Sequence, residues 1–135
     1  MFKQIKSKKR VKEKGEVFTN EREVKAMCDL IPENIWNDIN STFLEPTCGN
    51  GNFLVEILNR KLDKCKDEED VLFAVKSVYA IDIMSDNVKE SKERLLNIIK
   101  NKFPNSNFGK IKRIFNKQII CGDSLEIMKR WESEI

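Results

Sequence analysis

The chain has 135 residues, of which 40% are hydrophobic and 35% are charged, the balance expected of one globular domain with a modest core. Its apolar runs all fall short of the roughly 20 residues that a membrane span needs, and the basic amino-terminal stretch lacks the apolar segment of a signal peptide. We therefore expect a cytoplasmic protein without a membrane partner.

The four cysteines are widely spaced, no Cys-x-x-Cys pair occurs, and the sequence contains no histidine. We expect no metal site from this pattern, and no disulfides in a reducing compartment. Cys48 lies inside a glycine-rich stretch. We interpret it as a small filler residue, because no histidine exists to activate its thiol.

Residues 1–14 carry a net charge of +6, whereas the rest of the chain carries −3. The charge comes from seven basic residues set against Glu13: Lys3, Lys6, Lys8, Lys9, Arg10, Lys12 and Lys14. Two interpretations stay open, a solvated flexible tail and an arm that neutralises DNA phosphates without reading bases. We divide the chain into a basic flexible arm, residues 1–14, and one domain, residues 15–135.

Residues 15–20 predict a turn, followed by a helix that ends at Pro32. Its apolar residues recur at helical spacing: Val24, Met27, Cys28 and Ile31. Thr19 or Asn20 is expected to cap this helix. A second short helical segment, residues 32–39, places Trp36 in the core.

A strand over residues 42–45 is predicted next, followed by Gly49-Asn50-Gly51 and a helix over residues 52–61. Two glycines one residue apart allow positive φ and a close approach to a ligand at the end of a parallel strand. Glu45 ends the strand and disfavours a pyrophosphate, and Leu54 stands where a dinucleotide loop has its third glycine. S-adenosylmethionine, which is cationic and has no phosphate, fits this loop better than NAD.

A charged patch over residues 61–70 and an apolar-periodic piece over 71–75 are expected to form a surface insert without chemistry. The apolar run over residues 78–83 then predicts a buried parallel strand that places Asp82 at its carboxyl end. An acid there is placed to accept both ribose hydroxyls of an adenosine, and a helix cap is the alternative. Ile83 is placed to cover the adenine ring.

A strongly amphipathic helix is predicted over residues 86–100, and a loop over 104–109. Basic residues then lead into a third strand, residues 118–121, and a last helix over 125–131. Between these two elements lies Gly122-Asp123-Ser124, in which Asp123 is suited either to a ligand contact or to capping the last helix.

Glu45-Pro46-Thr47-Cys48-Gly49-Asn50-Gly51-Asn52-Phe53-Leu54 resembles the first motif of S-adenosylmethionine-dependent DNA methyltransferases that modify the exocyclic amino group of adenine. That motif reads acid-Pro-x-x-Gly-x-Gly-x-Phe-Leu. Gly15-Glu16-Val17-Phe18-Thr19 resembles the motif that these enzymes place before the fold, although Asn20 replaces the usual proline. The resemblance extends from residue 15 to about residue 125.

The resemblance implies a set of residues that bind S-adenosylmethionine. Thr19 would meet its methionine end, Asp82 its ribose, and Asp123 its adenine amino group with the Ser124 backbone beside it. The complete expected set is Thr19, Glu45, Pro46, Gly49, Gly51, Asp82, Ile83, Asp123 and Ser124. The implied fold is α/β, the first half of a Rossmann-like doubly wound methyltransferase fold, with about three parallel strands and flanking helices.

The implied function is cofactor binding within an adenine-specific DNA methyltransferase of a restriction-modification system. This family holds the flipped adenine with an Asp/Asn-Pro-Pro-Tyr/Phe segment, but Pro32, Pro46 and Pro104 are not adjacent here. We therefore predict no catalytic residue in this chain. We expect the amino-terminal portion of a larger enzyme, or one part of a split enzyme that needs a partner with the catalytic motif.

Two other functions stay open. A non-catalytic cofactor-binding or DNA-binding partner subunit would show the same loop and strand ends. A nicotinamide-dependent oxidoreductase is disfavoured by Glu45 and by the missing third glycine. Because only three strands are predicted, the strand over residues 42–45 is expected at a sheet edge, where it favours self-association.

Overall fold

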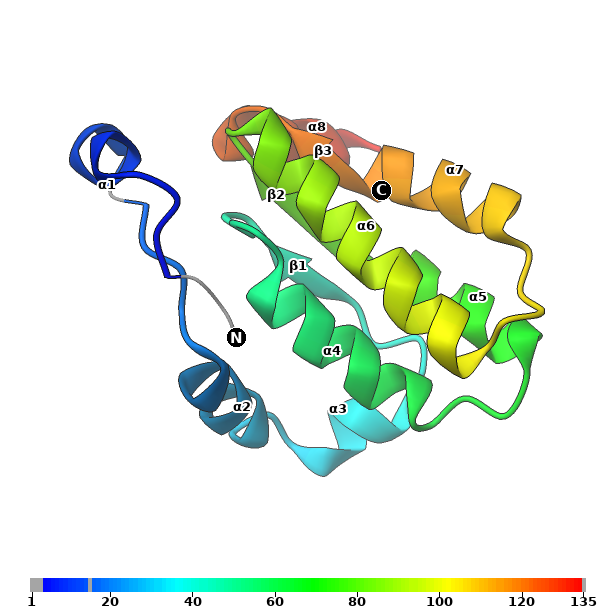
Figure 1. Ribbon diagram of the computed structural model, residues 1–135. Helices are drawn as coiled ribbons and strands as arrows, with labels where there is room; N and C mark the ends of the chain where they lie inside the picture. Colours follow the sequence, from blue (N-terminus) through cyan, green and yellow to red (C-terminus); the bar gives the residue numbers. More distant parts are fainter. Residues whose placement is uncertain (1–3, 15, 135) are drawn as a thin grey trace.

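The protein has α/β architecture, with a three-stranded parallel sheet and helices packed on it (Figure 1). The computed structural model describes residues 4–14 and 16–134. In chain order the elements are α1 (Lys8–Lys14), α2 (Glu21–Asp29), α3 (Glu33–Asn37), β1 (Phe43–Glu45), α4 (Asn52–Leu62), α5 (Glu68–Lys76), β2 (Val78–Asp82), α6 (Ser85–Lys102), α7 (Phe108–Gln118), β3 (Ile119–Cys121) and α8 (Ser124–Ser133).

The strand order is β1-β2-β3, and β2 pairs in parallel with both neighbours. Parallel neighbours need crossover connections, which α4 with α5 and α6 with α7 supply. As a result, the three loops that follow the strands emerge at the same edge of the sheet. The predicted α/β class with three parallel strands is confirmed, and β1 lies at the edge of the sheet.

The core lies between the sheet and two helices, α4 and α6, which run side by side in Figure 1. Val78, Ala80 and Ile119 face them and are fully buried. Tyr79 alternates with Val78 and Ala80 along β2, so its side chain lies on the other face of the sheet. There its ring packs edge to face on Trp131 of α8, with 5.3 Å between the ring centres. The two faces are therefore covered by different parts of the chain.

Helix α7 was not predicted. The sequence indicated a loop and a basic stretch before the third strand, but residues 108–118 form a helix that buries Ile111 and Phe115. These two residues are four apart and therefore share a helix face. Asn107 begins the helix, because its side chain accepts a hydrogen bond of 3.1 Å from the Lys110 N–H.

Met27 belongs to the apolar repeat of this helix, yet 54% of the residue is exposed. Helix α2 lies at the margin of the core and buries only Val24 and Cys28. Trp36 is buried as predicted and stacks on Phe43. Among the residues that the structure describes, no helix combines the length and apolar character needed to cross a bilayer.

Lys61 was predicted to belong to a charged surface patch, but only 1% of it is exposed. Its Nζ donates to the backbone carbonyls of Ile39 at 3.1 Å and Ser41 at 2.7 Å, and it lies 5.0 Å from the centre of the Phe43 ring. Burial lowers the pKa of Lys61 to about 8. This side chain joins the end of α4 to the segment that leads into β1.

Candidate functional site

A cavity of about 470 Å³ lies at the edge of the sheet where the strands end. Its size falls within the usual range of small-molecule sites. It is lined by the loops after all three strands and by the segment before α2: Glu16, Val17, Pro46, Thr47, Gly49, Asp82, Ile83, Gly122, Asp123, Ser124 and Leu125. Six residues of the predicted site are in this lining, and Thr19, Glu45 and Gly51 are not.

The two glycines after β1 have different roles. Gly49 has φ +53° and lines the cavity, and a Cβ at this position would lie 2.8 Å from the Phe18 ring. Gly51 has φ +95°, and a Cβ there would lie 2.9 Å from Ser91 Oγ and 3.2 Å from its Cα. Gly51 thus lets the start of α4 pack against α6, while Gly49 brings the backbone to the cavity.

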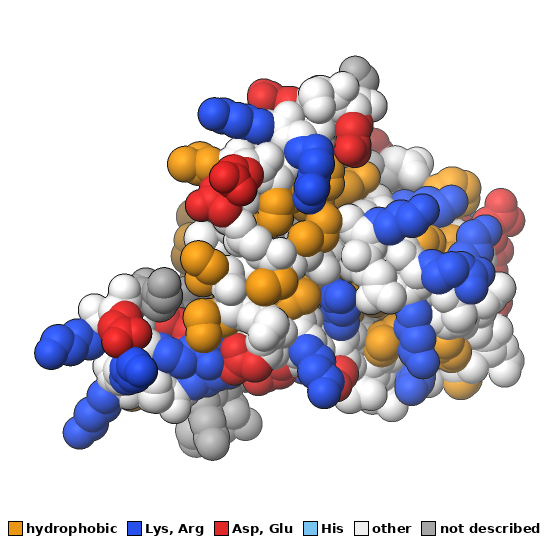
Figure 2. Space-filling model, turned by 90° about the horizontal axis from the view of Figure 1, so that it is seen from above, with side chains coloured by type: hydrophobic (Ala, Val, Ile, Leu, Met, Phe, Trp, Pro, Cys, Tyr) orange, Lys and Arg blue, Asp and Glu red, His pale blue; other side chains and the backbone are white. Residues whose placement is uncertain are grey.

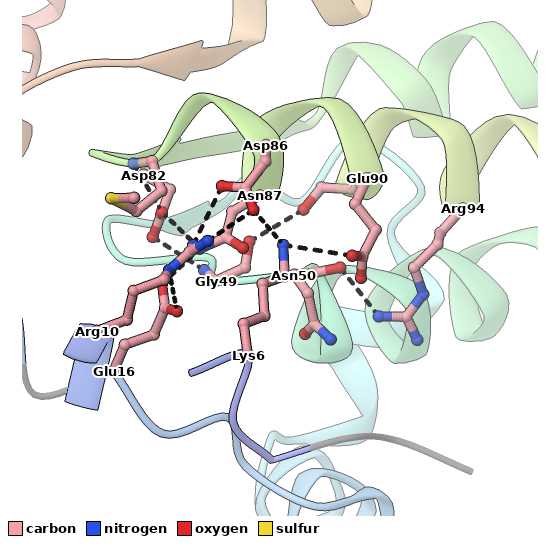
Figure 3. Close-up of polar contacts among 12 residues, drawn as sticks. Lys6, Arg10, Glu16, Gly49, Asn50, Asp82, Asp86, Asn87, Glu90 and Arg94 are labelled. Carbon is pink, nitrogen blue, oxygen red and sulfur yellow. Dashed lines mark hydrogen bonds and ion pairs between the residues drawn. The ribbon is translucent and has the colours of Figure 1, made fainter. Parts of the chain in front are cut away.

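Asp82 ends β2 and is held in one orientation by three hydrogen bonds (Figure 3). Its carboxylate accepts from the Gly49 N–H at 3.1 Å, from the Met84 N–H at 3.0 Å and from Asn87 Nδ2 at 2.9 Å. A carboxylate offers about four acceptor positions, so one remains for a ligand donor. The side chain is therefore fixed in the cavity wall before any ligand arrives.

The loop after β3 is joined to the loop after β1 by a hydrogen bond from the Ser124 hydroxyl to the Pro46 carbonyl. Asp123 caps α8, since its Oδ1 accepts from the Glu126 N–H at 3.1 Å, and it also lines the cavity. The cap and a ligand contact are compatible, because the cap occupies only one carboxylate oxygen.

Thr19 does not cap α2. Asn20 does, with its Oδ1 accepting from the Glu23 N–H at 3.0 Å. The Thr19 carbonyl instead accepts from Asn52 Nδ2 at 2.7 Å, which fixes this segment to the first turn of α4. The Thr19 hydroxyl does not line the cavity.

Glu45 is half-buried, and burial raises the pKa of its carboxyl group. Its Oε1 accepts from the backbone N–H of Thr47 at 3.2 Å and from the Thr47 hydroxyl at 3.4 Å. This carboxylate shapes the turn after β1 rather than facing the cavity.

Sequence reasoning missed Glu16 and Asn87. Asn87 is fully buried on α6, and its Nδ2 donates to Glu16 Oε2 at 2.7 Å as well as to Asp82. One amide thus joins two carboxylates that line the same cavity (Figure 3). Glu16 and Asn87 are 71 residues apart, so no local pattern connects them.

The cavity is acidic, since Glu16, Asp82 and Asp123 line it and no Lys or Arg is among its described lining residues. Such a wall disfavours phosphate groups and favours hydroxyls and cations. Burial, with a smaller effect of Asp82, raises the pKa of Cys48 to about 12, so its thiol is protonated and inert at neutral pH. The described residues contain no group of three or more acids and cysteines placed to hold a metal ion.

Comparisons of the chain with protein-family models, with curated proteins and with solved structures found no match. Its function is therefore inferred from the cavity and from the sequence motifs.

Proposed function

We propose that the chain binds S-adenosylmethionine, or its demethylated product S-adenosylhomocysteine, in the cavity at the ends of the strands. In this proposal it is the cofactor-binding part of a Rossmann-like, doubly wound methyltransferase that modifies the exocyclic amino group of adenine in DNA. The observation that carries the proposal is that one cavity gathers the loops after three successive parallel strands, with Asp82 fixed in its wall.

The chemistry of the wall supports this ligand over a dinucleotide. The ribose of an adenosine offers two hydroxyl donors, and the Asp82 carboxylate has one acceptor position left for one of them. The ammonium and sulfonium groups of S-adenosylmethionine are favoured beside Asp123, whereas the pyrophosphate of NAD is disfavoured there. The exposed side chain of Ile83 lines the cavity and offers an apolar surface for the adenine ring.

Binding the cofactor does not by itself transfer a methyl group. The acceptor nitrogen must be aligned with the sulfonium, and the family does this with a Pro-Pro segment that these 135 residues do not contain. We therefore propose that transfer to DNA requires a partner or a downstream segment that carries this motif. Incorporation of labelled methyl groups into adenine by residues 1–135 alone would contradict this part of the proposal.

The binding proposal is tested by calorimetry with S-adenosylhomocysteine and with NAD. Asp82→Ala should weaken S-adenosylhomocysteine binding on the order of ten- to a hundredfold, because it removes a charged hydrogen-bond acceptor. Glu93→Ala, at an exposed acid on α6, is the matched control and should leave the affinity unchanged. Tighter binding of NAD than of S-adenosylhomocysteine would favour the oxidoreductase alternative instead.

A further inference from the structure

The basic amino-terminal segment is docked beside the cavity through two of its charged side chains. Arg10 binds Glu16 with Nε at 2.7 Å and Nη2 at 2.9 Å, and binds Asp86 with Nη1 at 2.6 Å and Nη2 at 3.1 Å. Lys6 lies 3.0 Å from Asp86 and 3.3 Å from Glu90. The planar guanidinium group of Arg10 therefore binds two carboxylates at once, which the ammonium group of a lysine cannot do in this geometry (Figure 3).

A continuous chain of contacts leads from Arg10 to the cavity wall. Arg10 neutralises Glu16, Glu16 accepts from Asn87, and the same Asn87 amide group donates to Asp82. The side chains of Glu16 and Arg10 are mostly shielded from water, at 10% and 18% exposure. Without Arg10, Glu16 would be a poorly hydrated charge without a counter-ion, sharing one amide with a second carboxylate.

The backbone supports the same docking. The Phe18 N–H donates to the Gln4 carbonyl, and the buried Phe18 ring lies against Gly49 of the loop after β1. The segment before α2 thus reaches the cavity wall through Phe18, which lies against Gly49, as well as through Glu16 and Asn87. Other lysines of α1, Lys8, Lys9 and Lys12, are exposed, and Figure 2 shows Lys and Arg side chains projecting from this part of the molecule at the left.

We propose that Arg10 is a positioning residue of the cofactor site, which holds Glu16 and, through Asn87, the carboxylate of Asp82. The inference rests on the proposed function. It gives part of the basic segment a role in the site, distinct from the contact with DNA phosphates that its charge suggested. By linkage, ligand binding and docking of residues 4–14 strengthen each other by the same factor.

The test is a double-mutant cycle on S-adenosylhomocysteine affinity, measured by calorimetry. Arg10→Ala should weaken binding about tenfold. Arg10→Lys should weaken it less, because lysine keeps the positive charge but lacks the planar guanidinium group that binds both carboxylates. In an Asp82→Ala background the effect of Arg10→Ala should disappear, since Arg10 acts through Asp82. Lys9→Ala removes the same charge from an exposed position of α1 and should change the affinity less than twofold.

The outcomes separate the two proposals. If the wild type does not bind the ligand, the proposed function fails and this inference fails with it. If the wild type binds and Arg10→Ala matches it, or if the two substitutions are additive, the inference alone is overturned. Circular dichroism checks that each variant is folded, and if Arg10→Ala is not, Arg10→Lys takes its place in the cycle.

Discussion

The two sides of the cavity are held by different forces. The loop after β1 is fixed by packing, because it runs into α4, whose Leu54 and Leu58 are fully buried against the sheet and α6. Residues 4–14 are held chiefly by ion pairs of Lys6 and Arg10 with the partly exposed carboxylates of Asp86 and Glu90. Apolar packing keeps its strength in salt and in acid, whereas ion pairs near water are weakened by both. One wall of the site is therefore robust and the other depends on solution conditions.

The packed side should suffer most from the loss of core volume. Leu54→Ala removes a fully buried side chain next to the glycine loop and should cost about 2–5 kcal/mol of unfolding free energy. Leu30→Ala, at a leucine that is 83% exposed, should change stability by less than about 0.5 kcal/mol. Urea unfolding measures both variants, and equal losses would show that α4 is not the anchor.

A buried charge is the exception on the packed side. The pKa of Lys61 is lowered to about 8 in the folded protein and is near 10.4 when unfolded, so between these values the unfolded chain binds more protons. The contribution of Lys61 to stability should therefore rise from pH 8 to about pH 10.5, by on the order of 2–3 kcal/mol. Urea unfolding should show this rise as the difference between the wild type and Lys61→Met, because both share the buried thiols whose raised pKa values lower stability at alkaline pH. A difference that stays constant across this range would contradict the burial of this ammonium group.

The face of the sheet that carries α8 is less completely covered than the α4–α6 face. A groove of about 850 Å³ lies over it, next to β1, and Leu44 is 45% exposed there. The Phe43 N–H donates to the Ser77 carbonyl, so the backbone groups of Phe43 point toward β2. Because the backbone groups of successive strand residues point to opposite sides, those of Leu44 point to the open edge. We expect self-association through this edge at tens of micromolar, measured by sedimentation.

Leu44→Lys tests this association, since charged residues block edge pairing. It should weaken association at least tenfold, or about 1.4 kcal/mol. Thr42 lines the same groove, and Thr42→Ser is the control that keeps its polarity. A monomeric wild type at these concentrations would contradict the expectation.

The smallest effect is expected at the ion-paired side. Hydrogen bonds from Arg10, then from Lys6, lower the pKa of Asp86 well below its usual value near 4. Because the folded pKa is depressed, the stabilisation is complete above about pH 4 and is lost as pH falls below it. Docking should be constant between pH 5 and 8, and the loss in acid should stay below about 1 kcal/mol for so exposed a pair.

A nuclear magnetic resonance titration of the Asp86 carboxyl group checks this expectation. At pH 3 the group should still be ionised, while Arg10→Ala should return its pKa toward 4. An Asp86 midpoint near 4 in the wild type would mean that Arg10 and Lys6 do not dock there in solution.

The sequence by itself predicted the features whose signals are local. Short apolar runs indicated parallel strands, and the spacing of Gly49 and Gly51 indicated the turn after β1. Acids directly after strands indicated Asp82 and Asp123, because parallel strands of one sheet present their carboxyl ends at one edge. These properties depend on residues within a few positions of one another, so they can be read without knowing the packing.

Only the tertiary structure decided which charges are buried and which carboxylates meet. From the sequence, Lys61 was assigned to a charged surface patch and Arg10 to a basic arm that is either a solvated tail or a contact for DNA phosphates, because both residues lie in charged stretches. Arg10 and Asp86 are 76 residues apart, and Lys61 reaches carbonyls about 20 residues before it. Such contacts form where packed elements cross, which depends on the arrangement of the whole chain and leaves no periodic mark in the sequence.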